Sequence, residues 1–194
     1  MASISYRDSI RWLPDEASEP SDTVVLSSPK SNVFVDVRFI KGTKDLDWAF
    51  AGYRSVLGPD VTQFVHLIDS RTLDALSVDD RGTNSALSDG RTLETGEMVN
   101  PATGNIMAYE EIWREETSDQ FLFVKNYEGT TWRARAGRWQ VALGRDSDGE
   151  FWAWQAEKDD NGAWVMKNST ENARQHADLL PDDMMVLDKN WVVI

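Results

Sequence analysis

The chain has 194 residues and a formal net charge of −13, from 33 acidic and 20 basic side chains, and it contains no cysteine. The negative charge repels nucleic-acid phosphates, so we expect no nucleic-acid partner, and the lack of cysteine excludes disulfides, thiolate nucleophiles and cysteine-ligated metals. The N-terminus lacks the apolar core of a signal peptide, and no stretch is apolar enough to cross a bilayer. We therefore expect a cytoplasmic or nuclear protein without membrane insertion.

Most of the chain alternates apolar and polar residues, which is the pattern of β-strands with one buried face. In residues 33–39 the odd positions are all apolar, while Asp36 and Arg38 point to the other side. We predict a half-buried strand there. Further strands are predicted in segments rich in β-branched or aromatic residues, at 61–68, 120–125 and 138–143.

The stretch 69–95 is rich in Asp, Ser, Thr, Gly and Asn and has little periodicity, which is typical of a linker or a long loop. We place the domain boundary near 90–101. The sequence is therefore divided into an N-terminal domain at 1–95 and a C-terminal domain at 96–194.

A weak internal repeat supports this division. The residues around Tyr6 resemble those around Tyr109, and an Ala-x-Ala-Gly pattern ending at Gly52 recurs at Gly137. We predict two pseudo-repeated domains in which these residues are equivalent. Chance similarity is the alternative.

The second half carries the clearest turn signals. Asp-Gly at the end of 145–149 and Asn-Gly at the end of 159–162 supply the positive φ angles of tight hairpins, so 132–164 is predicted to form an antiparallel meander. One short helix is predicted at 171–180, capped by Ser169 or Thr170 and ended by the following proline.

Four short motifs are distinctive. They read Asp-Trp-Ala-Phe-Ala-Gly at 47–52, Glu-Thr-Gly at 94–96, Tyr-Glu-Glu-Ile-Trp at 109–113 and Gly-Arg-Trp at 137–139. In these motifs the chain resembles a fungal family, the casein-kinase-I-interacting proteins, which consist of two successive calycin-like (lipocalin-like) domains. The resemblance implies an all-β fold of antiparallel calycin-like β-barrels and association with a protein kinase. A full barrel needs about eight strands. Each half of the chain offers fewer, so we expect shortened or incomplete barrels.

Motifs for catalysis and cofactor binding are missing from the sequence. There is no Gly-x-Ser-x-Gly elbow or Gly-rich phosphate loop, and the two histidines, His66 and His176, lie outside any metal-ligand spacing. We expect no metal and no other cofactor, and interpret His66 as a hydrogen-bonded core residue and His176 as solvated. Glu110 and Glu111 are adjacent and would point to opposite faces of a strand, which favours a solvated charge run over an acid–base pair.

The best functional lead is a cluster of tryptophans in the second half. Trp152 and Trp154 share a strand face, and small alanines on a neighbouring strand would leave room for a small apolar ligand inside a barrel. An arginine would fix an acidic group of that ligand. The predicted ligand-binding residues are Trp132, Ala134, Ala136, Arg138, Trp139, Trp152 and Trp154. The alternative is that these indoles simply fill the core.

Two functions are compatible with these sequence features. The first is a non-enzymatic calycin-like protein that acts through protein association, with a casein-kinase-I-type partner, and that binds a small hydrophobic ligand. The alternative is a barrel enzyme, a cyclase or isomerase, acting on a hydrophobic polyketide or terpenoid in fungal secondary metabolism. Such an enzyme needs no catalytic triad, because orienting a reactive substrate supplies much of the rate.

Overall fold

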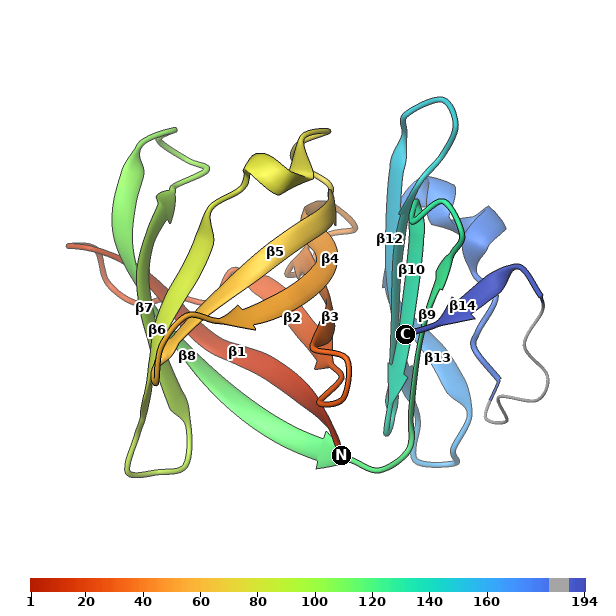
Figure 1. Cartoon of the computed structure of the whole chain (residues 1–194), viewed down its shortest axis with the longest axis horizontal. Helices are drawn as coiled ribbons and strands as arrows, with labels where there is room; N and C mark the ends of the chain where they lie inside the picture. Colours follow the sequence, from red (N-terminus) through yellow and green to blue (C-terminus); the bar gives the residue numbers. More distant parts are fainter. Residues whose placement is uncertain (182–188) are drawn as a thin grey trace.

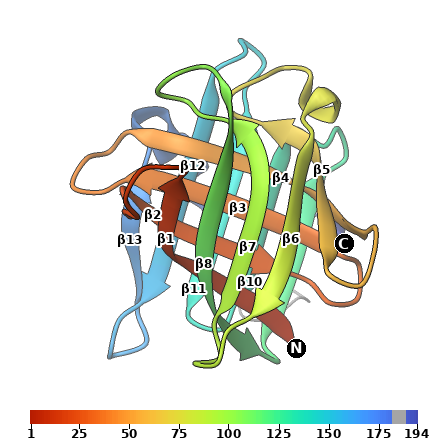
Figure 2. The same cartoon turned by 90° about the vertical axis from the view of Figure 1, so that its left-hand side faces the viewer.

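The computed structural model describes residues 1–181 and 189–194, which form a closed β-barrel and a second β-sheet beside it (Figure 1). The strands of the barrel are neighbours in chain order, and β1 closes it by pairing with β8 (Figure 2). Within the described residues the barrel has eight antiparallel strands. They are β1 (Ala2–Trp12), β2 (Ser21–Ser27), β3 (Val33–Ile40), β4 (Leu46–Val56), β5 (Val61–Asp69), β6 (Asp80–Ala86), β7 (Thr92–Val99) and β8 (Ile106–Ser118).

The second sheet is open, and over the described part of the chain it has six strands in the order β13-β12-β11-β10-β9-β14. Its strands are β9 (Phe121–Asn126), β10 (Thr131–Ala136), β11 (Trp139–Arg145), β12 (Phe151–Lys158), β13 (Trp164–Ser169) and β14 (Trp191–Val193). Two 3₁₀ helices, η1 (Ala75–Ser77) and η2 (Glu171–His176), accompany the strands. None of the described helices is long and apolar enough to cross a membrane.

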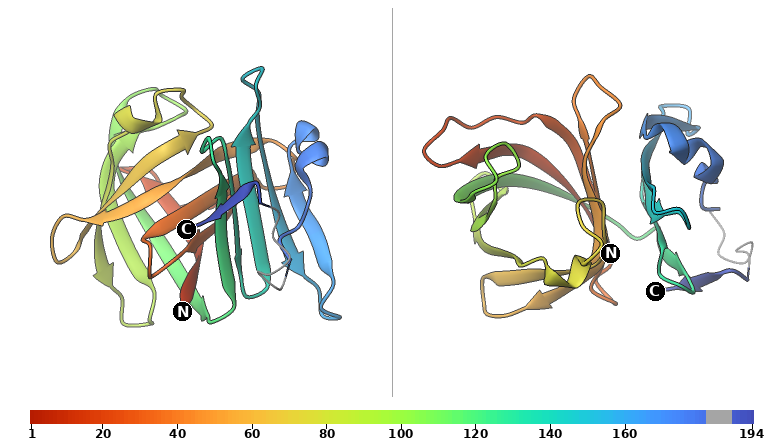
Figure 3. Two further views of the ribbon diagram at one scale, coloured as in Figure 1. Left: turned by 45° about the vertical axis from the view of Figure 1, so that its right-hand side comes forward. Right: turned by 90° about the horizontal axis from the view of Figure 1, so that it is seen from above.

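One hydrophobic core joins the barrel to the sheet. The second sheet lies beside the barrel (Figure 3). The odd residues of β3 face outward from the barrel and pack against this sheet, where Trp132, Ala134 and Leu143 belong to the same buried cluster. Burying this apolar surface on both sides holds the two layers together. Gln155 adds polar contacts, because its amide nitrogen donates to the backbone oxygens of Asp22 and Val37 in the barrel, at 3.0 and 2.7 Å.

The prediction of an all-β antiparallel fold is confirmed, and each predicted strand is present. The second unit is an open sheet, however, and only the first is a barrel. The barrel ends at Ser118, so the predicted boundary at 95/96 falls inside β7. The predicted linker at 69–95 contains η1 and β6, whose inward positions are occupied by Asp80, Gly82 and Asn84. Polar and small residues inside the barrel gave this strand the composition of a loop.

The residues of the internal repeat do not occupy equivalent places. Tyr6 lies on β1 and Tyr109 on β8, and these two strands pair with each other in one barrel. Gly52 follows a break in the β4–β5 register, as expected for a bend, whereas Gly137 lies in the β10–β11 turn with φ of 54°. The short helix predicted at 171–180 is present as η2, preceded by Thr170, and is a 3₁₀ helix.

Candidate functional site

A cavity of about 360 Å³ lies inside the barrel, within the range of about 300–1,000 Å³ that small-molecule sites occupy. Side chains on alternate residues of the strands line it, because successive residues of a strand point to opposite faces. Its apolar wall consists of Val25, Trp48, Phe50, Phe64, Met98 and Trp113. The end of β4 contributes Val56 and the β4–β5 turn contributes Asp60. Since Val56 is 76% exposed, the cavity opens to solvent there.

Two arginines and three carboxylates form an ion-pair network along one side of the cavity, in which Glu19 pairs with Arg7 at 2.9 Å. Arg38 binds Asp36, its nearest neighbour, at 2.7 Å, and its other terminal nitrogen lies 3.6 Å from Glu111. Glu111 also accepts a hydrogen bond of 2.6 Å from Arg7. The guanidinium of Arg38 further lies over the ring of Trp48, 5.1 Å from its centroid. Charged groups buried in this way need paired partners, and Glu111 serves both arginines.

His66 is fully buried between two carboxylates. Its Nδ1 lies 2.7 Å from Asp69 and its Nε2 3.0 Å from Asp80, while its ring stacks on Phe50 at a centroid distance of 4.1 Å. Burial acts to lower the pKa of His66, but the hydrogen bonds to Asp69 and Asp80 outweigh it and raise that pKa above its ordinary value. The structure therefore agrees with the interpretation of His66 as a hydrogen-bonded core residue.

Glu94 is the unusual acid of the cavity. It is only 7% exposed and stands directly beside Glu111 in the β7–β8 pairing. Its Oε1 accepts a hydrogen bond of 2.9 Å from the hydroxyl of Tyr109, and no other hydrogen bond reaches its carboxyl group from the described residues. Burial, followed by the charges of Glu111 and Asp80, raises the pKa of Glu94 to about 8. A group with this pKa can donate or accept a proton near neutral pH.

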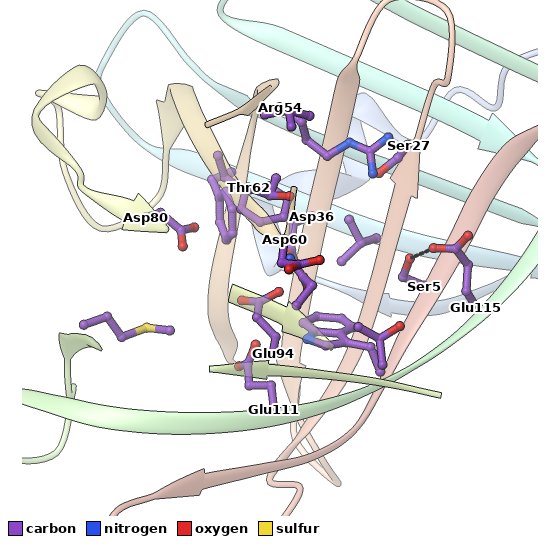
Figure 4. A pocket seen from close by; sticks show the side chains of 18 of the residues that line it. Ser5, Ser27, Asp36, Arg54, Asp60, Thr62, Asp80, Glu94, Glu111 and Glu115 are labelled. Carbon is purple, nitrogen blue, oxygen red and sulfur yellow. Dashed lines mark hydrogen bonds between the residues drawn. The ribbon is translucent and has the colours of Figure 1, made fainter. Parts of the chain in front are cut away.

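Figure 4 shows that Glu94 and Glu111 extend from neighbouring strands, with Arg54 and Ser27 elsewhere around the same cavity. Burial lowers the pKa of Arg54, and its guanidinium forms no ion pair with any described residue. Nowhere in 1–181 or 189–194 do three or more His, Asp or Glu side chains stand in a group that could hold a metal ion. The side chains that line the cavity offer proton donation, ion pairing and aromatic contact.

The residues predicted from the sequence lie in the second sheet and are divided between its two faces. Trp132, Ala134 and Ala136 are buried on the face that packs against the barrel, with Trp139 at its edge. Trp152 and Trp154 are buried on the opposite face, in a cluster with Ala173 of η2. The geometry thus does not bring these two groups together around one space. Ligand binding by either group stays a prediction.

Two further residues, Arg138 beside β11 and His176 at the end of η2, differ from their expected surroundings. Arg138 is at the surface, where it pairs with Glu157 at 3.0 Å. His176, interpreted from the sequence as solvated, is half-buried, stacks on Trp152 at 4.3 Å and lies 3.0 Å from Asp146.

The residues that line the barrel cavity follow the alternation of polar and apolar positions in the sequence. This alternation alone does not show that the polar positions face a cavity. Asp36 and Arg38 alternate correctly with apolar neighbours, but the polar side of this strand faces the barrel interior and not solvent. Glu111 likewise is buried, whereas its neighbour Glu110 is partly exposed. Alternation identifies the two faces of a strand, and it cannot tell a polar interior from water. Glu94 belongs to the distinctive motif at 94–96, and this motif was the sequence feature that set it apart from the other acidic residues.

Comparisons with known proteins agree with the fold. A family model described as Protein HRI1 matches residues 3–193. The crystal structure of the uncharacterized protein YLR301w from Saccharomyces cerevisiae superposes with a TM-score of 0.76 at 16% sequence identity, covering 100% of this chain and 98% of that one. This likeness shows a shared fold. No curated protein matches the chain.

Proposed function

This chain belongs to the HRI1 protein family, and from its barrel we propose that it is a non-enzymatic binding protein that holds a small molecule with an apolar body inside the barrel. The observation that carries the proposal is the cavity of about 360 Å³ with its wall of aromatic side chains. Protein interiors are normally close-packed, and larger side chains at the lining positions would fill a cavity of this size. A calycin-like role, implied by the sequence resemblance, is consistent with it.

The test is a titration with Nile red, a neutral apolar dye whose emission increases in apolar surroundings. Thr62 lines the cavity on β5, and its neighbour Gln63 does not. We expect Thr62→Trp to fill the cavity and weaken dye binding at least about tenfold, and Gln63→Trp to leave it within about twofold. Equal binding by both variants would place the dye outside the barrel and contradict the proposal.

A second candidate function is an acid–base enzyme, the cyclase or isomerase considered from the sequence. The observation that favours it is Glu94, a buried acid with a raised pKa that is held by Tyr109 in the wall of the cavity. Such an acid is suited to proton transfer to a bound carbonyl compound. Incubating a naphthyl methyl ketone with the protein in deuterated water tests it. Catalysed exchange of the methyl hydrogens that is lost in Glu94→Gln would favour the enzyme.

Association with a casein-kinase-I-type protein kinase is a separate proposal, supported by the sequence resemblance alone. Action in the cytoplasm or nucleus is a further proposal, supported by the composition and the N-terminal sequence. Binding of the purified full-length chain to purified casein kinase I, followed by calorimetry, tests the association. No heat of binding at micromolar concentrations would remove it.

A further inference from the structure

The cavity walls carry more negative than positive groups. Among the described residues that line it, six are carboxylates and two are guanidinium groups. The carboxylates are Asp36, Asp60, Asp80, Glu94, Glu111 and Glu115, and the guanidinium groups are Arg38 and Arg54. An excess of one charge inside low-dielectric walls favours a ligand of the opposite charge.

Internal partners satisfy most of the buried acids. Asp36 binds Arg38, Glu111 binds Arg7, and Asp80 binds His66. Asp60 and Glu115 are exposed at the rim, where water solvates them. Of the buried carboxylates in the cavity wall, Glu94 alone has no cationic partner among the described residues.

One of the two oxygens of the Glu94 carboxyl group has a hydrogen-bond partner among the described residues. Tyr109 donates to Oε1, and no described residue forms a hydrogen bond with Oε2. A second polar group of the cavity wall also has no partner, in this case a donor that would need an acceptor on the ligand. The indole Nε1 of Trp113, another lining residue, is buried and has no hydrogen-bond partner within the described part of the chain. Buried polar groups without partners are rare in native proteins, and such groups in a cavity wall are suited to binding a ligand.

Resting on the proposed function, we propose that the ligand of the barrel is an organic amine whose ammonium group binds Glu94 and whose apolar body lies against the aromatic wall. A charge-assisted hydrogen bond to a buried carboxylate is stronger than a neutral one. The side chains of Trp48, Phe50 and Trp113 line the same cavity and offer apolar surface to the body of the ligand. The guanidinium of Arg38 already lies over these three rings, 5.1, 5.4 and 5.9 Å from their centroids, so the ammonium group is assigned to Glu94.

Proton release accompanies this binding. The groups that influence the carboxyl of Glu94 are Glu111 and Tyr109 from β8, Asp80 from β6 and Arg38 from β3. With a pKa of about 8, Glu94 is mostly protonated at pH 7 in the empty barrel. Binding an ammonium group favours the ionised form, so the proton leaves. Amine affinity therefore increases as the pH rises toward 8.

The experiment compares three probes of nearly equal size by calorimetry: naphthylethylamine, the neutral naphthylethanol and the anionic naphthylacetate. At pH 8 we expect the amine to bind the unchanged protein about tenfold or more tightly than the alcohol. Glu94→Gln should reduce this difference to about twofold or less, because the amide keeps an acceptor for Tyr109 but loses the charge. Glu97→Gln removes the same charge from an exposed position of the same strand, and it should leave the preference unchanged.

Proton release is measured on the unchanged protein at pH 7, in buffers of different ionisation enthalpy, and does not depend on the folding of any variant. We expect a release of close to one proton with the amine and none with the alcohol. An alcohol that binds as tightly as the amine, or an amine preference that persists in Glu94→Gln, would overturn the inference while leaving the proposed function intact. Tighter binding of naphthylacetate would assign the charge recognition to Arg54 and overturn it as well. If no probe binds, the proposed function itself is contradicted.

Discussion

Gly82 and Glu94 lie so close on neighbouring strands that a Cβ atom on Gly82 would stand 2.5 Å from the Glu94 side chain. The missing side chain on β6 thus creates the space in which the buried carboxyl group rests. Gly96, the partner of Gly82 in the β6–β7 pairing, provides space for Tyr109 in the same way, since its Cβ would stand 2.8 Å from the tyrosine ring. Two paired glycines therefore position the acid and its hydrogen-bond donor.

Gly82→Ala tests this arrangement. The added methyl group must displace the Glu94 carboxyl and break its bond to Tyr109, so we expect a loss of about 1–3 kcal/mol in the free energy of unfolding. Gly58→Ala is the control, because nothing lies within 4 Å of its Cβ position. We expect it to change stability by less than about 0.5 kcal/mol. Urea unfolding of the two variants checks this, and equal midpoints would show that Gly82 is not needed for space.

Glu94 should make stability depend on pH. Its pKa is raised in the folded chain to about 8 from an ordinary value of 4.5, so the folded state holds more protons between these values. The contribution of Glu94 protonation to the free energy of unfolding is then fully present below pH 4.5 and is lost as the pH rises toward 8. In Glu94→Gln this contribution is absent, and we expect the variant to gain on the order of 4 kcal/mol relative to the unchanged protein between pH 5 and 9. Parallel pH profiles of the unfolding free energy would contradict it.

Glu110 and Glu111 are neighbours in the sequence with opposite surroundings, which allows a matched comparison. Removing Glu111 leaves Arg7 and Arg38 buried without their shared partner, so we expect Glu111→Ala to cost about 3–5 kcal/mol or to prevent folding. Glu110 forms a partly exposed pair with Arg11 at 3.5 Å. We expect Glu110→Ala to cost less than about 1 kcal/mol. Thermal melting at equal concentration measures both, and similar losses would refute a buried role for Glu111.

The contact between barrel and sheet can be weakened at Gln155. Gln155→Leu has a similar volume but leaves the backbone oxygens of Asp22 and Val37 without this donor. We expect a loss of about 1–3 kcal/mol in the free energy of unfolding. The exposed Gln120→Leu serves as the control and should be nearly neutral. An unchanged urea midpoint for Gln155→Leu would mean that the two hydrogen bonds contribute little to docking of the sheet.

Local patterns in the sequence were sufficient to predict the strands of both layers, since the alternation in 33–39 and the Asp-Gly and Asn-Gly turns act over a few residues. The division into domains was predicted from composition, and the composition of β6 is typical of a loop. This is because the strand places Asp80, Gly82 and Asn84 inside the barrel. Closure of the barrel by β1 and β8 joins residues over 100 positions apart. No local pattern encodes that pairing.

The cavity was harder to predict than the fold. Trp152 and Trp154, which are predicted to face a ligand, pack on the side of the open sheet away from the barrel, in a cluster with Ala173, and ligand binding there stays a prediction. The charged residues that do line a cavity resembled a solvent face, because a polar barrel interior has the same period as a strand exposed to water. Only the three-dimensional pairing of Glu94 with Glu111 reveals that their carboxylates share one enclosed space.

The outward side chains of β3 bear on how this architecture can evolve. Val33, Val35, Val37 and Phe39 would lie bare on the outside of the barrel if the second sheet were deleted, and bare apolar strands promote aggregation. The link between the layers, from Ser118 to Phe121, leaves only two residues between β8 and β9. A gene duplication or domain exchange that carried the barrel without the sheet would therefore expose these four side chains to solvent, and we expect such a product to aggregate more readily than the whole chain.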